Sequence, residues 1–122
     1  MKQHNVILEK SYDFALRTIK LYMHLRKQKV ERELLIQLLK SGTSIGANIE
    51  EAVGAQSKSD FIHKAGVAYK ESRETFYWLR LFKDANIIDE KLADSFLADS
   101  EELKKILSSI LKTTKGTNAP NS

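Results

Sequence analysis

The segment Gly42-Thr43-Ser44-Ile45-Gly46 has the Gly-x-Ser-x-Gly spacing of the nucleophile elbow of serine hydrolases. In those enzymes a sharp turn between a β-strand and a helix exposes the serine hydroxyl above a parallel sheet, beside an oxyanion hole. Ser44 is therefore a candidate nucleophile only if a strand precedes it. No stretch of the 122-residue chain shows sustained period-two alternation, and the residues around Ser44 follow a helical period. We conclude that Ser44 is not a nucleophile.

Arg17 and His24 form the second candidate for chemistry, because they lie seven residues apart and share one helix face. A histidine that titrates near neutral pH can move the proton of a 2′-hydroxyl, while an arginine stabilises the charge of the phosphorane. This Arg-x₆-His spacing resembles the motif of the all-helical HEPN ribonucleases, and the resemblance implies RNA cleavage. The competing interpretation is a solvated polar face. We prefer it, because such spacings are common by chance in a helix rich in Lys and Arg.

Metal and nucleotide chemistry find no support in the residue pattern. A di-iron site in a helical bundle needs Glu-x-x-His on each of two helices. The nearest sequence runs from Asp60 to His63, has Asp in place of Glu and has no second copy. No Gly-Lys-Ser/Thr of a phosphate-binding loop occurs. We therefore expect no metal, no cofactor, no small-molecule substrate and no enzymatic activity.

The composition favours helices and a reducing compartment. The single proline is Pro120, near the C-terminal end, and cysteine is absent. The first ten residues lack the apolar core of a signal peptide, and no run approaches the roughly 20 apolar residues of a membrane span. We expect a cytoplasmic protein that does not bind membranes.

Four segments carry apolar residues at three- and four-residue steps: 7–27, 31–55, 61–79 and 92–110. Ser57 followed by Asp60 is typical of a capping box, and Asn86 followed by Asp89 is typical of a helix end and a new N-cap. Because the connections are short, neighbouring helices must run antiparallel. The sequence predicts an all-α fold, an up-down-up-down antiparallel four-helix bundle of residues 1–112, followed by a mobile C-terminal tail of residues 113–122.

The first and third segments each carry two apolar stripes. The stripe assigned to the core of the first consists of Leu8, Tyr12, Ala15, Ile19, Tyr22 and Met23. The surplus stripes consist of Ile7, Phe14, Leu21 and Leu25 on the first segment and of Val67, Trp78 and Phe82 on the third. Large apolar patches on a second face indicate a partner surface. We expect Phe14, Leu21, Trp78 and Phe82 to contact neighbouring protomers. The alternative is a wide core with scattered exposed apolar residues.

Gly42 and Gly46 lie four residues apart on one helix face. Each costs about 1 kcal/mol of helix propensity relative to alanine. We expect this cost to be offset by close approach of another helix backbone, with a kink as the alternative.

Basic residues gather at the first predicted turn, with one more near the second. The candidates for nucleic-acid binding are Arg26, Lys27, Lys29, Arg32 and Lys58. The chain has 20 basic and 16 acidic residues, a formal net charge of +4. Phosphate contact needs little more than such a cluster. No aromatic platform for base stacking is evident in the sequence, so charge and shape would govern binding.

The block from Ser41 to Leu81 resembles the four-helix-bundle family of the large-subunit ribosomal RNA intervening-sequence proteins. The matching residues are Ser44, Ile45, Asn48, Ile49, Glu51, Gly54, Phe61, Glu74 and Leu79. The sequence departs from the family pattern at Ala52, where a glycine is usual, and at Ala55 and Gln56, where basic residues are common. Because Ala55 and Gln56 stand where basic residues are common, Lys58 is the basic residue that remains near the second predicted turn.

The resemblance implies a bacterial four-helix bundle that often assembles as a ring-like homopentamer. It also implies kinship with the accessory variability protein of diversity-generating retroelements, a basic pentamer that binds nucleic acid and a reverse transcriptase. The motif residues Ser44, Asn48, Glu51 and Glu74 line helix edges, where packing alone or a polar network would explain them. The leading hypothesis is a non-enzymatic oligomer that binds RNA or a ribonucleoprotein. The alternatives are a protein-interaction scaffold and, more distantly, the ribonuclease that uses Arg17 and His24.

Overall fold

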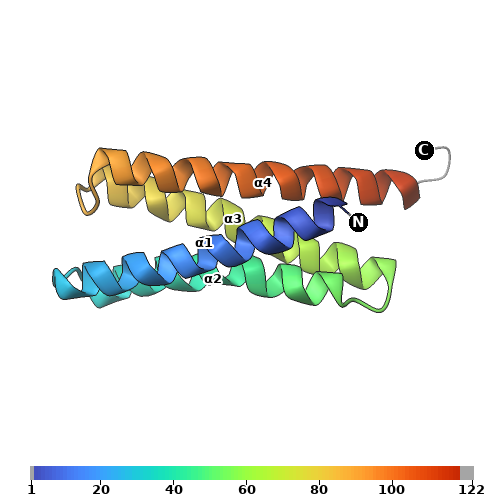
Figure 1. Cartoon of the computed structure of the whole chain (residues 1–122), viewed down its shortest axis with the longest axis horizontal. Coiled ribbons are helices and arrows are strands. Elements are labelled where there is room, and N and C mark those ends of the chain that lie inside the picture. The colour runs from blue at the N-terminus through green and yellow to red at the C-terminus, as the bar shows by residue number, and fades with distance from the viewer. Residues whose placement is uncertain (1, 119–122) are drawn as a thin grey trace.

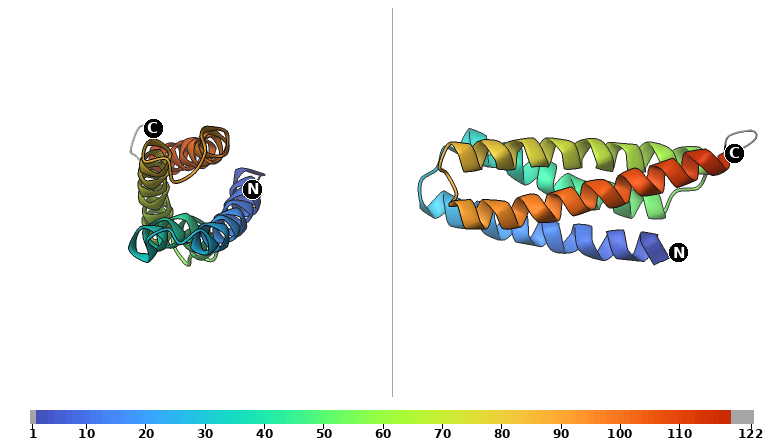
Figure 2. Two further views of the ribbon diagram at one scale, coloured as in Figure 1. Left: turned by 90° about the vertical axis from the view of Figure 1, so that its left-hand side faces the viewer. Right: turned by 90° about the horizontal axis from the view of Figure 1, so that it is seen from above.

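A computed structural model describes residues 2–118, which form a bundle of four helices. These are α1 (Lys2–Lys27), α2 (Arg32–Val53), α3 (Lys58–Asp84) and α4 (Glu90–Asn118) (Figure 1). Each helix packs on the next along the chain, α4 closes the arrangement against α1, and within the described residues the backbones of the diagonal pairs do not approach closely. Seen end-on, the helices follow one another in chain order around the bundle (Figure 2). The predicted all-α, up-down-up-down antiparallel four-helix bundle is confirmed.

On each helix six buried positions, spaced alternately by three and four residues, form a seam that faces the core, and α2 buries Ser41 and Gly46 in addition. This is the spacing that keeps one seam of a helix facing its neighbours. The seam of α1 is Ile7, Ser11, Phe14, Thr18, Leu21 and Leu25. The seams of the other helices are Leu35, Leu38, Gly42, Ile45, Ile49 and Ala52 in α2; Ala65, Ala68, Ser72, Thr75, Leu79 and Phe82 in α3; and Ala93, Phe96, Ser100, Leu103, Leu107 and Ile110 in α4.

These seams correct the predicted faces of α1 and α3. Phe14 is 3 % exposed, Leu21 is 5 % exposed and Phe82 is 1 % exposed, all within the chain's own core. Trp78 is half-buried and packs against that core. The expectation that Phe14, Leu21 and Phe82 face a neighbouring protomer is therefore wrong, because their side chains fill the bundle. In the stripe assigned to the core of α1, Tyr12, Ile19 and Met23 are instead exposed, whereas Leu8 and Tyr22 are partly buried and pack against the edge of the core.

The hydroxyl residues of the α1 seam explain the wrong assignment. Ser11 and Thr18 are each 1 % exposed, yet they interrupt the seam when only apolar residues are counted. Thr18 Oγ1 donates to Phe14 O at 2.8 Å and Ser11 Oγ donates to Leu8 O at 3.2 Å. A hydroxyl that donates to its own helix backbone can be buried without an unsatisfied donor.

The two glycines of α2 allow α1 to approach closely, as predicted. A Cβ added at Gly46 would lie 3.2 Å from the backbone oxygen of Ser11. A Cβ added at Gly42 would lie 2.8 Å from Thr18 Cγ2. The helix-propensity cost of these glycines is thus offset by packing at the α1–α2 contact.

Helices α1 and α3 end in the same motif, in which one residue adopts the left-handed conformation. Val30 N donates to Leu25 O at 3.3 Å and Lys29 N donates to Arg26 O at 3.0 Å, with φ of 63° at Lys29. Ile87 and Asn86 donate likewise to Phe82 and Lys83 after α3, with φ of 60° at Asn86. These are the hydrogen bonds of a Schellman motif, whose last residue packs against the helix.

Lys29 occupies a conformation that glycine adopts without steric cost and lysine does not. We expect Lys29→Gly to raise the free energy of unfolding by about 1 kcal/mol, measured by urea denaturation. Asn86→Gly is the matched control, because asparagine already tolerates this conformation and the gain should be smaller. Equal gains, or a loss at Lys29, would show that left-handed strain does not limit this turn.

The starts of α3 and α4 agree with the N-caps predicted from the sequence, and the C-terminal boundary does not. Ser57 Oγ accepts from Asp60 N at 3.0 Å, and Asp89 Oδ1 accepts from Leu92 N at 2.9 Å, so both predicted N-caps are confirmed. Helix α4, however, continues to Asn118, which contradicts a tail starting at residue 113. Residues 119–122 of that expected tail lie outside the described part of the chain. Within residues 2–118 no helix has the length and apolarity to span a bilayer.

Candidate functional site

A cluster of basic residues surrounds the α1–α2 turn, which lies at the end of the bundle opposite the start of α1 and the end of α4 (Figure 1). Four exposed side chains surround it and are called here the turn cations: Arg26, Lys27, Lys29 and Arg32. None of the four forms an ion pair with the described residues 2–118. Residues 20–40 contain six Lys or Arg and two Glu, a formal net charge of +4 that equals the net charge of the whole chain.

Lys58 does not belong to this group. It begins α3, at the end of the bundle that carries the chain termini (Figure 1). The predicted nucleic-acid site is therefore divided, with four residues gathered at one end and Lys58 at the other. A single bound phosphate chain would have to follow the length of the bundle to contact both parts.

Arg17 is engaged in contacts that tie α1 to α4. Its guanidinium donates to Asp99 Oδ2 at 2.8 Å and to Ser95 Oγ at 2.7 Å. The same group lies 4.0 Å from the centre of the Phe96 ring, within the range of a cation–π contact. Arg17 thus has three partners on α4 and holds the two helices together.

His24 lies on the same face as Arg17, as the spacing predicts. The two residues line a shallow depression between α1 and α4, together with Lys20, Leu21, Leu92 and Phe96. The exposed His24 ring nitrogen Nε2 is 3.3 Å from Gln28 Nε2. The arrangement places an imidazole near a guanidinium that is already occupied by Asp99, so a phosphate would compete with a carboxylate for Arg17.

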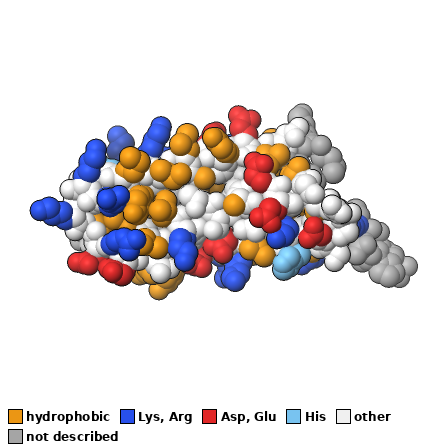
Figure 3. All heavy atoms as spheres, turned by 90° about the horizontal axis from the view of Figure 1, so that it is seen from below, with side chains coloured by type: hydrophobic (Ala, Val, Ile, Leu, Met, Phe, Trp, Pro, Cys, Tyr) orange, Lys and Arg blue, Asp and Glu red, His pale blue; other side chains and the backbone are white. Residues whose placement is uncertain are grey.

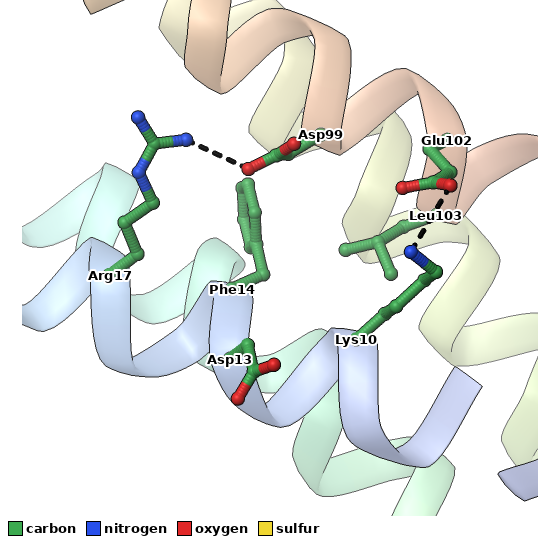
Figure 4. Close-up of a pocket in the computed structure, with 7 residues that line it drawn as sticks. All are labelled: Lys10, Asp13, Phe14, Arg17, Asp99, Glu102 and Leu103. Carbon is green, nitrogen blue, oxygen red and sulfur yellow. Dashed lines mark hydrogen bonds and ion pairs between the residues drawn. The ribbon is translucent and has the colours of Figure 1, made fainter. Parts of the chain in front are cut away.

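A second depression separates α1 from α4 next to Arg17, and Figure 4 shows two pairs of oppositely charged residues that face each other across it. Lys10 Nζ lies 3.3 Å from Glu102 Oε2, and Arg17 binds Asp99 across the same gap. The Phe14 ring meets Phe96 edge-on, with 6.1 Å between ring centres. Within each ion pair the two opposite charges neutralise each other, so this depression has the features of a helix contact rather than a binding site. No cluster of three metal-binding side chains occurs within residues 2–118.

The family-motif residues of α2 are bonded mostly within their own helix. Ser44 Oγ donates to Lys40 O, and Asn48 Nδ2 donates to Ser44 O at 2.9 Å. Glu51 reaches α3, where its Oε1 lies 2.7 Å from Lys64 Nζ. The hydrogen bond to Glu51 raises the pKa of Lys64. Ser44 and Asn48 therefore act in local helix structure, and Glu51 links α2 to α3.

Glu74 also bonds within its helix, since its Oε2 accepts from Trp78 Nε1 at 3.3 Å. Burial first, and then the neighbouring Glu74 carboxylate, raise the pKa of Glu71. Within the described residues, the α2 motif contacts α3 through the ion pair of Glu51 with Lys64, and Glu74 does not take part in that contact.

An exposed apolar face runs along α1, and three of its four residues belong to the stripe that was predicted to face the core. We call it the outer stripe: Tyr12, Leu16, Ile19 and Met23, which are 64 %, 43 %, 40 % and 55 % exposed. Figure 3, which views the bundle from below, shows apolar side chains gathered toward the end with the α1–α2 turn and Lys or Arg around them. This surface is more apolar than a solvated helix face requires.

A groove between α3 and α4 was not predicted from the sequence. It is lined by Tyr69, Lys70, Arg73, Glu74, Phe76, Tyr77, Arg80 and Lys104. The signal was present in α3, where aromatic and basic residues share one helix face between residues 69 and 80. Lys104 lies on α4, so the pattern of α3 could not predict that this residue also lines the groove.

The comparisons with known proteins agree with this architecture. The sequence model of the 23S rRNA-intervening sequence protein family matches residues 3–109. A solved structure from Bacteroides thetaiotaomicron VPI-5482, described as a protein of unknown function from the S23 ribosomal protein family, is 45% identical. The similarity covers 90% of this chain and 98% of that chain, with a TM-score of 0.87. No curated protein matches the chain. The chain, with its four-helix bundle and its Ser44 to Leu79 motif, belongs to the 23S rRNA-intervening sequence protein family.

Proposed function

We propose that the protein is a non-enzymatic, self-associating four-helix bundle that binds RNA through charge and shape. The observation that carries this proposal is the group of four exposed turn cations without ion-pair partners in the described chain. Unpaired cations on a rigid turn bind phosphate without first breaking an internal ion pair. The family resemblance supports an RNA of ribosomal or retroelement origin, free or within a ribonucleoprotein.

Self-association is supported by the outer stripe of α1, which replaces the residues first predicted for the interface. Four large apolar side chains at three- and four-residue spacing can pack against a neighbouring protomer. The family resemblance favours a ring of five. In such a ring each protomer adds its net charge of +4 to one field, which strengthens phosphate binding.

The test of function is recovery of RNA with the purified protein at low salt, followed by sequencing of what is bound. We expect RNA to copurify and to dissociate as the salt concentration rises. The protein should leave the RNA intact, and His24→Ala should behave as wild type. Absence of RNA and DNA would favour the protein scaffold, while cleavage that His24→Ala abolishes would favour the ribonuclease.

Assembly is tested by placing charge in the outer stripe. We expect Ile19→Glu with Met23→Glu to dissociate the particle to a monomer of 13.9 kDa, measured by light scattering. A well-packed interface residue contributes about 2 kcal/mol or more, so the dissociation constant should rise at least about 30-fold. Helix content should not change, because both side chains are exposed in the protomer.

Leu81→Glu is the matched control, because Leu81 is 40 % exposed on α3, outside the outer stripe. It should leave the assembly intact. A wild-type protein that remains monomeric at tens of micromolar would contradict the proposed assembly.

A further inference from the structure

The groove between α3 and α4 combines aromatic rings with positive charge. Three aromatic side chains, Tyr69, Phe76 and Tyr77, line it together with the α3 cations Lys70, Arg73 and Arg80. Tyr77 is 51% exposed, which leaves much of its ring accessible to a ligand. The composition is that of a surface that stacks bases and binds phosphates.

The charges of the groove are unevenly neutralised. Lys104 Nζ lies 2.9 Å from Glu101 Oε1, an ion pair that lowers the pKa of Glu101. The same ammonium is 4.9 Å from the centre of the Phe76 ring. Arg73 and Arg80, by contrast, form no ion pair within residues 2–118. The carboxylate that lines the groove belongs to Glu74, which accepts from Trp78.

We propose that this groove binds single-stranded RNA, with a base stacked on Tyr77 and phosphates held by Arg73 and Arg80. The inference rests on the proposed RNA-binding function and assigns it a second surface with different chemistry. The turn cations offer charge alone, whereas the groove also offers π faces, which a duplex with stacked bases does not use. Besides Lys104, which is paired with Glu101, three cations face one lining carboxylate, and this excess favours a polyanion over an acidic or neutral protein segment.

The length of the groove suits a short strand. From Tyr69 to Arg80 the helix rises about 16 Å. At about 3.4 Å per stacked nucleotide this corresponds to about five nucleotides. An eight-nucleotide oligouridylate therefore covers the groove, and it stays single-stranded because it carries no base complementary to uracil.

The chain contains an internal reporter for this site. Trp78 is the single tryptophan, and its ring meets Tyr77 edge-on with 5.4 Å between ring centres. A base that stacks on Tyr77 should change the fluorescence of Trp78. We expect octauridylate to change this signal saturably, and we expect an abasic ribose-phosphate octamer and octaglutamate to bind more weakly.

The variants separate stacking from charge. Tyr77→Ala should weaken octauridylate binding about 10-fold, followed by anisotropy of a labelled strand, while Tyr77→Phe should retain it. Arg73→Gln with Arg80→Gln should reduce the salt slope of binding by about 1.4. Equal affinity for octauridylate and octaglutamate, or unchanged affinity in Tyr77→Ala, would overturn the inference.

Failure of the proposed function gives a different result. If the wild-type protein binds neither octauridylate nor duplex RNA, both proposals fail. If it binds RNA through the turn cations and Tyr77→Ala binds as wild type, the groove proposal fails and the proposed function stands.

Discussion

Replacing the four turn cations together by glutamine should lower the affinity for duplex RNA by up to about a thousand-fold at 0.1 M salt. Each phosphate contact releases a counterion and contributes about 0.9 to the slope of log affinity against log salt, so four contacts contribute about 3.6. The loss should shrink toward high salt, where counterion release no longer favours binding. Because all four side chains are exposed, the bundle should fold as before.

The measurement is a salt titration of RNA binding, with circular dichroism to verify the fold. The matched control removes four charges away from the turn, by glutamine at Lys58, Lys105, Lys112 and Lys115; Lys105 lies near the middle of α4 and the other three lie toward the opposite end of the bundle. This control should keep most of the affinity. Equal losses in the two variants would mean that binding is spread over the whole surface, and no loss in the turn variant would mean that the turn is only solvated.

The features that were predicted correctly depend on residues close in sequence. The N-caps at Ser57 and Asp89 are set by residues three positions away, and the end of α3 at Asn86 by its own backbone conformation. The turn cations could be predicted for the same reason, since the first, Arg26, and the last, Arg32, are six positions apart in the sequence. Local patterns of this kind determine helix ends and turns whatever the tertiary packing.

The core face of α1 depended instead on what its neighbour offers. When only apolar residues are counted, the stripe with Tyr12 and Ile19 is predicted to face the core, because the polar residues Ser11 and Thr18 interrupt the seam that is in fact buried. Those two hydroxyl residues are small enough to pack against Gly46 and Gly42 of α2. An alternation of three- and four-residue steps that admits Ser, Thr and Gly identifies all four seams.

The contacts that define the role of Arg17 and of the α3–α4 groove are also tertiary. Asp99 lies 82 residues from Arg17 in the sequence, and nothing near Arg17 indicates that its guanidinium is occupied. Lys104 reaches the groove from α4 in the same way. Spacing on one helix could suggest these residues as candidates, but only the packing of helices decides which of them remain free to bind a ligand.

Gly42→Ala should destabilise the bundle relative to Gly66→Ala by about 2 kcal/mol. Both changes gain helix propensity, about 1 kcal/mol each. At Gly66 no atom lies within 4 Å of the added Cβ, so Gly66→Ala should stabilise the fold by that amount. At Gly42 the new Cβ would lie 2.8 Å from Thr18 Cγ2, and overpacking of this kind costs about 1–3 kcal/mol.

Thr18 cannot easily move away from an alanine at position 42. It is 1 % exposed, and a change of rotamer would break the 2.8 Å hydrogen bond from its hydroxyl to Phe14 O. Thr18→Ser removes the clashing methyl and keeps that hydroxyl. We expect the Gly42→Ala, Thr18→Ser double variant to be more stable than the sum of the single changes predicts, by about 1 kcal/mol or more in urea denaturation. Strict additivity would show that α1 and α2 shift apart at little cost, and that the glycine face does not set their close approach.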